Sequence, residues 1–155
     1  MLAGLLPESG LLTRGARPDG AARADIWRGV AVCRALGAAD VGQAAVVQQG
    51  LVLGVEAIEG TDALLARCGK LRRQGRGGVL VKLAKPGQDR RLDLPAVGPE
   101  TVRNAAAAGL AGIAFEAAAT VLLDRERTVA EADAAGLFLL ALEPEHRNTD
   151  EENER

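Results

Sequence analysis

The chain has 155 residues and a mass of 16.0 kDa, which is enough for one domain with a hydrophobic core and too little for two large ones. Hydrophobic residues make up 48% and charged residues 26%, so the chain is globular and not disordered. Aromatic residues make up only 2%, which argues against a nucleic-acid binder that stacks bases on aromatic rings. Cys33 and Cys68 form no CxxC pair and His146 lies alone in a polar tail, which disfavours a disulfide framework, a structural zinc site and histidine chemistry.

The net charge of -2 conceals two segments of opposite charge. The tail from Glu143 to Arg155 carries six acidic and two basic residues, and we expect it to be disordered. Residues 70–91 carry eight basic residues and one acidic residue, Asp89. A basic cluster of this kind attracts phosphates, although it is equally typical of a solvated surface loop.

The ends of the chain predict a cytoplasmic protein. The first six residues are apolar, but no basic region precedes Pro7 and Glu8, so they do not resemble a signal peptide. No apolar run approaches the ~20 residues that a membrane-spanning helix needs.

Residues 1–20 predict a connector between domains, because they contain two prolines, four glycines and few periodic apolar positions. Residues 21–36 predict a helix that buries Ile26, Val30 and Cys33 on one face and ends at Gly37.

A hairpin is predicted over residues 43–57, where two apolar runs flank Gln49-Gly50. A helix follows over residues 63–73, with Gly60 or Thr61 as its N-cap.

The second half of the chain alternates between predicted strands and helices. Two prolines and a glycine exclude a helix or a central strand over residues 84–95. The other predicted elements are strand 78–83, helix 99–108, strand 110–116, short strand 120–123, a helix capped by Asp124 and ending at Ala135, and strand 137–142. Residues 21–142 are therefore expected to form an α/β domain with a mixed sheet, in which an N-terminal hairpin precedes β-α-β units and helices pack on the sheet.

The polar segment that follows strand 78–83 is a candidate ligand site, since ligands of open α/β sheets bind beyond the carboxyl ends of the strands. Its residues offer cations, carboxylates and an amide, the mixture that phosphoryl transfer needs. A surface loop of ion pairs is the alternative. The candidates are Lys82, Lys85, Gln88, Asp89, Arg90, Arg91 and Asp93.

The segment between the hairpin and the next helix is a second candidate. Backbone N–H groups of Gly60 and Thr61 at the helix start suit an anion. Glu56, Glu59 and Asp62 suit a cation, while simple helix capping by Thr61 is the alternative.

Three stretches resemble the C-terminal domain of the LpxI-type UDP-2,3-diacylglucosamine pyrophosphatases. They are Val55-Glu-Ala-Ile-Glu-Gly-Thr-Asp62, the stretch from Gly78 to Gly98 that includes Lys85-Pro-Gly-Gln-Asp-Arg-Arg91, and residues 106–116 with Ala108-Gly-Leu-Ala-Gly-Ile-Ala114. The resemblance covers roughly residues 11–142, and the Lys-Pro-Gly-Gln-Asp-Arg-Arg stretch is its most specific part.

The resemblance implies a Mg²⁺-dependent hydrolase of lipid A synthesis that converts UDP-2,3-diacylglucosamine to UMP and 2,3-diacylglucosamine 1-phosphate. The family's essential aspartate corresponds to Asp89, with Asp93 as the fallback. By this assignment Asp89, Lys85 and Gln88 are catalytic. The expected phosphate-binding residues are Lys82, Arg90, Arg91, Thr61 and Gly60, and the expected metal ligands are Asp89, Asp93, Glu59 and Asp62.

Family members also carry an N-terminal domain, which is absent from these 155 residues, so we expect this chain alone to be weakly active or inactive. The expected partners are the UDP-linked lipid substrate, that missing domain, the cytoplasmic face of the inner membrane through peripheral contact, and a second copy in a homo-oligomer, but no nucleic acid. The alternatives from other functional classes are a non-catalytic nucleotide- or anion-binding module and a dimerisation module.

Overall fold

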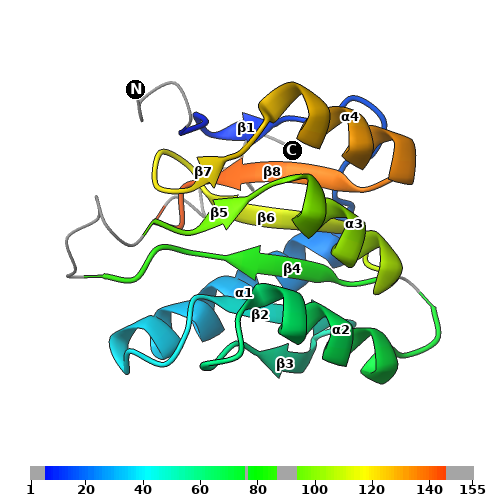
Figure 1. The fold of residues 1–155 in the computed structure, drawn as a ribbon. Helices are drawn as coiled ribbons and strands as arrows, with labels where there is room; N and C mark the ends of the chain where they lie inside the picture. Colours follow the sequence, from blue (N-terminus) through cyan, green and yellow to red (C-terminus); the bar gives the residue numbers. More distant parts are fainter. Residues whose placement is uncertain (1–5, 76, 87–93, 146–155) are drawn as a thin grey trace.

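A mixed six-stranded sheet forms the centre of the protein, seen in a computed structural model that describes residues 6–75, 77–86 and 94–145 (Figure 1). In spatial order the strands are β1 (Gly10–Leu11), β8 (Phe138–Leu142), β6 (Gly112–Glu116), β4 (Val79–Lys82), β2 (Ala44–Gln48) and β3 (Leu51–Val55). Strands β4, β6 and β8 run parallel, whereas β2 is antiparallel to both β3 and β4, and β1 is antiparallel to β8. The predicted fold class is therefore confirmed, including the β2–β3 hairpin before the β-α-β units.

Four helices cover the two faces of this sheet. Helix α1 (Gly20–Ala38) lies behind it in Figure 1, and the other three lie in front. These are α2 (Thr61–Leu71), α3 (Pro99–Ala107) and α4 (Arg125–Ala135). Alternate side chains of β2, β4, β6 and β8 enter two separate hydrophobic cores, as the two-residue period of a strand requires.

Strand β4 shows which face each of its side chains serves. Val79 and Val81 join the core under α1, whereas Leu80 joins the core under α2, α3 and α4. The same alternation places the last residue, Lys82, on the face of the three helices and at the carboxyl end of the strand.

Two strands were missed because each has only two residues. Strand β1 lies within the segment predicted as a connector and pairs with the end of β8. Strand β5 (Ala96–Val97) pairs in parallel with β7 (Val121–Leu122) to form a second, separate sheet. Two residues are too few to show the alternating pattern of a strand, so such strands cannot be predicted from periodicity. Their hydrogen bonds to other strands stabilise them.

Some predicted details of the helices also differ from the structure. Helix α2 spans Thr61–Leu71, where residues 63–73 were predicted. Gly37 does not end the first helix, which continues to Ala38 while Gly37 packs against Pro86. Asp124 occupies the N-cap position of α4, but its side chain makes no capping hydrogen bond because its backbone is left-handed, with φ of 46°.

The tight β2–β3 turn is held by a buried carboxylate of α1. Asp25 is 6% exposed, and its two carboxylate oxygens accept hydrogen bonds from the backbone N–H groups of Gln49, at 3.1 Å, and Gly50, at 2.8 Å. Replacing Asp25 by alanine is expected to lower the free energy of unfolding by about 1–3 kcal/mol, since the N–H groups of Gln49 and Gly50 both lose their acceptor. Urea unfolding measures this loss. Glu8→Ala, at an exposed position, serves as the control and is expected to change stability by less than about 0.5 kcal/mol; equal effects would contradict the assignment.

Candidate functional site

A cavity of about 460 Å³ opens beside the carboxyl end of β4, on the face covered by α2 and α3. It lies at the edge of the sheet where ligands of α/β proteins bind. Its walls come from the loop before α2, the end of β4, the short strand β5, the start of α3 and the residue after β7. The lining residues are Glu59, Gly60, Thr61, Asp62, Lys82, Ala96, Gly98, Pro99, Glu100, Thr101 and Leu123.

Helices α2 and α3 both begin at this cavity, at the same edge of the sheet in Figure 1. Each N-cap is a glycine, Gly60 or Gly98, so no side chain covers the N–H groups of the first turn. Gly60 has φ of 88°, a conformation that glycine adopts at little cost. The two helix N-termini thus direct partial positive charges and N–H donors toward the cavity, which favours an anion at that end of it.

Lys82 brings the only lysine ammonium group that lines the cavity within the described part of the chain. Its side chain is buried, with 8% exposure, and its Nζ donates a hydrogen bond to the backbone oxygen of Ala96 at 2.9 Å. Burial lowers the pKa of Lys82, and the negative charges of Glu56 and Asp62 oppose that shift. One Nζ hydrogen bond leaves two further donors for a ligand.

Three acidic residues share the cavity wall with this lysine. The carboxylate of Glu59 forms an ion pair with Arg67, and Asp62 accepts a hydrogen bond from the side-chain amide of Asn104 at 3.1 Å. Glu100 lies in the first turn of α3. The carboxylates suit a hard divalent cation or the hydroxyl groups of a sugar, whereas Lys82 and the helix N-termini suit phosphate.

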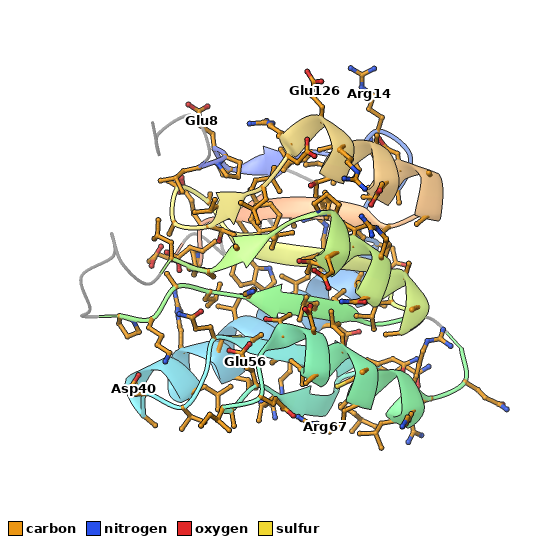
Figure 2. The ribbon with its side chains drawn as sticks, in the orientation of Figure 1. Glu8, Arg14, Asp40, Glu56, Arg67 and Glu126 are labelled. Carbon is orange, nitrogen blue, oxygen red and sulfur yellow. The ribbon has the colours of Figure 1, made fainter. Side chains whose placement is uncertain are left out.

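Glu56 lies directly behind the cavity wall, beside the start of α2 (Figure 2). It is only 9% exposed. One carboxylate oxygen accepts a hydrogen bond from the backbone N–H of Gln43 at 3.1 Å, and the other accepts one from the hydroxyl of Thr61 at 2.9 Å. Gly60 is the N-cap of α2 and Thr61 is its first residue. The hydroxyl of Thr61 donates to Glu56, which precedes the helix in sequence.

Lys85 does not line this cavity. Its Nζ lies 3.1 Å from the carboxylate of Asp40, which Figure 2 shows at the carboxyl end of α1. The neighbouring Pro86 packs against Gly37 of the same helix. Lys82 and Lys85 are three positions apart in sequence, yet Lys82 bonds to Ala96 of β5 and Lys85 pairs with Asp40, just after α1.

The structure thus brings together five of the predicted site residues: Glu59, Gly60, Thr61, Asp62 and Lys82. The predicted residues Gln88, Asp89, Arg90, Arg91 and Asp93 lie outside the described residues. Sequence analysis missed the contribution of α3, through Gly98 and Thr101. The available signal was Pro99, because a proline in a first turn marks a helix start, and this helix starts at the edge of the sheet.

Metal ligation was predicted from four carboxylates, of which the structure describes Glu59 and Asp62. Among residues 6–75, 77–86 and 94–145, no group of three or more histidine, cysteine, aspartate or glutamate side chains is close enough to hold a metal ion. Both cysteines are buried free thiols, and burial raises the pKa of Cys33 to about 12 and that of Cys68 above its usual value. They are therefore unreactive rather than catalytic.

The sheet, the two helix N-termini and the buried lysine define an α/β domain with a candidate anion-binding cavity at the carboxyl end of a central strand. The model of the LpxI C-terminal domain matches residues 8–140, and the chain belongs to this family. A relative from Caulobacter vibrioides, named UDP-2,3-diacylglucosamine pyrophosphatase LpxI, is 49% identical over 130 residues. The match covers 80% of this chain and 46% of the relative, so the chain spans about half the length of the curated relative. The resemblance seen in the sequence is confirmed.

None of the helices in the described part of the chain is long and apolar enough to cross a membrane.

Proposed function

We propose that this chain supplies the phosphate-binding half of a site that hydrolyses the pyrophosphate bond of UDP-2,3-diacylglucosamine to UMP and 2,3-diacylglucosamine 1-phosphate. The observation that carries the proposal is the cavity in which the buried ammonium group of Lys82 meets the N-termini of α2 and α3. The name of the Caulobacter relative supports the choice of substrate.

The described residues suit the charge that this reaction develops. Attack of water on one phosphorus adds negative charge to the phosphate oxygens and releases a phosphate leaving group. Lys82 and the first-turn N–H groups of the two helices are fixed before the substrate binds, so they stabilise that charge without reorganising. Asp89 is proposed as the catalytic carboxylate, with Gln88 beside it in sequence. Lys85 stays a proposed catalytic residue, although its ammonium group pairs with Asp40 outside this cavity.

Mg²⁺ is proposed as the cofactor. Its ligands would be Asp62 and Glu59 from the cavity wall, with Asp89 and Asp93. Asp62 and Glu59 already bond to Asn104 and Arg67, so each carboxylate would have to loosen these bonds in order to hold the cation. When bound, Mg²⁺ shields the negative charge of the phosphates.

The place of action is part of the proposal. A diacylated substrate partitions into membranes, so we propose that the enzyme works in the cytoplasm with peripheral contact at the inner membrane. A homo-oligomer is compatible with this arrangement. The remaining half of the two-domain enzyme is proposed to close over the cavity, which explains why the chain alone is expected to be weakly active or inactive.

A chimera tests the proposed reaction. This chain replaces the matching half of the Caulobacter relative, and release of UMP from UDP-2,3-diacylglucosamine is measured with Mg²⁺ and with a chelator. We expect hydrolysis that the chelator abolishes and that Asp89→Ala lowers by at least about 100-fold, because the variant removes the proposed catalytic carboxylate.

Three outcomes would count against the proposal. Retained turnover in the Asp89→Ala chimera would remove Asp89 from the mechanism. Full activity with the chelator would remove Mg²⁺. A chimera that binds UMP but releases none from the substrate would favour a non-catalytic binding module.

A further inference from the structure

The hydrogen bonds of Glu56 determine what Thr61 can offer to a ligand. Both carboxylate oxygens of Glu56 act as acceptors, from the N–H of Gln43 and from the hydroxyl of Thr61. A hydroxyl has one proton and two lone pairs. Because Thr61 donates its proton to Glu56, only lone pairs remain for a ligand in the cavity that Thr61 lines.

The position of Glu56 is fixed by its backbone as well as by its side chain. Its backbone N–H donates to the oxygen of Ala44 at 2.9 Å, which extends the β2–β3 ladder by one residue. Its own carbonyl oxygen lies against the α-carbon of Gly42, where an added Cβ would come within 2.0 Å. The backbone of Glu56 is therefore held on both sides, and this residue is 9% exposed, with its carboxylate hydrogen-bonded through both oxygens.

The cavity already has separate donors for phosphate oxygens. Lys82 and the first-turn N–H groups of α2 and α3 are donors only, whereas a phosphate oxygen accepts hydrogen bonds. An acceptor such as the Thr61 oxygen, held in this way, would repel a phosphate oxygen at hydrogen-bond distance.

We propose that Glu56 is a positioning residue that makes the hydroxyl of Thr61 an acceptor-only group. This hydroxyl then contacts a hydroxyl group or a divalent cation in the bound substrate complex and gives no hydrogen bond to its phosphates. The inference rests on the proposed function for the identity of the cavity, and it limits the phosphate-binding role that the sequence suggested for Thr61 to the backbone N–H of that residue.

The direction of the Glu56–Thr61 hydrogen bond can be tested without a ligand. A hydroxyl proton held by a buried carboxylate exchanges slowly, so we expect a resolved Thr61 hydroxyl signal in the NMR spectrum of the full chain. The signal should disappear in Thr61→Val and change in Glu56→Gln. It should persist in Glu59→Gln, a matched control that removes a carboxylate of the same cavity that pairs with Arg67 instead. If the wild-type chain shows no such signal, the inference about Thr61 is contradicted, while the proposed function is unaffected.

Binding of metal-free inorganic pyrophosphate, measured by calorimetry, gives the second test. Thr61→Val should leave the affinity within about twofold, because no hydrogen bond to phosphate is lost. In Glu56→Gln the amide nitrogen can donate to Thr61, which frees the hydroxyl proton for the ligand. We expect a gain of about two- to tenfold, of which the part due to the freed hydroxyl proton is lost in the Glu56→Gln/Thr61→Val double variant.

The control for this gain is again Glu59→Gln, since removing any nearby negative charge favours an anion. Any gain in Glu59→Gln should persist when Thr61 is also valine. A loss of more than about fivefold in Thr61→Val would show that Thr61 donates to phosphate, contrary to the inference.

Two further probes separate a hydroxyl partner from a cation. If Thr61→Val weakens UMP binding in chelator, Thr61 accepts from a hydroxyl of the nucleotide. If it weakens pyrophosphate binding only with Mg²⁺ present, Thr61 contacts the cation. No loss with either probe would contradict the inference, and a wild-type chain that binds neither UMP nor pyrophosphate would overturn the proposed function and the substrate role of Thr61 with it.

Discussion

Replacing Lys82 by methionine is expected to weaken the binding of inorganic pyrophosphate to this chain by about 10- to 100-fold, the range for one or two charge-assisted hydrogen bonds. Methionine keeps the apolar stem that packs at the end of β4 and removes only the charge and the donors. Calorimetric titration measures the effect. Lys70→Met, at an exposed position in the last turn of α2, removes the same charge and is expected to change the affinity by less than about threefold.

The same substitution at Lys85 distinguishes the roles of Lys82 and Lys85. Lys85 pairs with Asp40 outside the cavity, so Lys85→Met should weaken pyrophosphate binding less than Lys82→Met does. A larger loss of pyrophosphate affinity in Lys85→Met than in Lys82→Met would show that Lys85, and not Lys82, contacts the phosphate.

The pH dependence of Lys82 gives opposite signs for stability and for binding. Burial lowers the pKa of Lys82 in the folded chain below its unfolded value of 10.5. Between these two values the unfolded chain binds more protons, so the free energy of unfolding of the wild type, relative to Lys82→Met, rises as the pH rises through that window. Pyrophosphate affinity falls over the same window, because the ammonium charge is lost. Urea unfolding and calorimetry over this pH range measure both trends, and parallel trends would contradict the assignment.

The sequence predicted most of the fold because its longer elements carry strong local signals. The hairpin is marked by Gln49-Gly50 between two apolar runs, and α3 is marked by Pro99. The short strands β1 and β5 have no such signal, since their hydrogen bonds come from residues far away in the chain. Tertiary pairing, and not propensity, determines them.

The candidate site was predictable only in part, for a related reason. Composition placed Lys82 and Lys85 in one basic segment, but it gave no indication that Lys82 ends a strand on the face of α2 while Lys85 turns to α1. Strand alternation says which residues share a face, but which helix covers that face depends on chain topology. The role of Glu56 likewise depends on one hydroxyl proton, which no residue pattern specifies.

The second large effect is expected for Gly42→Ala. A Cβ on residue 42 would lie 2.0 Å from the carbonyl oxygen of Glu56 and 2.8 Å from its carbonyl carbon. Backbone atoms have no rotamers through which to yield, so the variant must separate the start of β2 from the end of β3. We expect a loss of about 3 kcal/mol in the free energy of unfolding, at the upper end for an overpacked position.

Gly20→Ala is the matched control for this loss, because an added Cβ on the first residue of α1 meets no atom within 4 Å. Alanine also favours the helix, so stability should change by less than about 0.5 kcal/mol or rise slightly. Gly42→Ala should also change the hydroxyl proton signal of Thr61, since moving Glu56 breaks the bond between them. A Gly42→Ala chain with wild-type stability and an unchanged signal would show that Gly42 does not hold Glu56 in place. A Gly42→Ala chain that loses stability and also loses the Thr61 hydroxyl signal would show that the packing of Gly42 maintains the Glu56–Thr61 hydrogen bond.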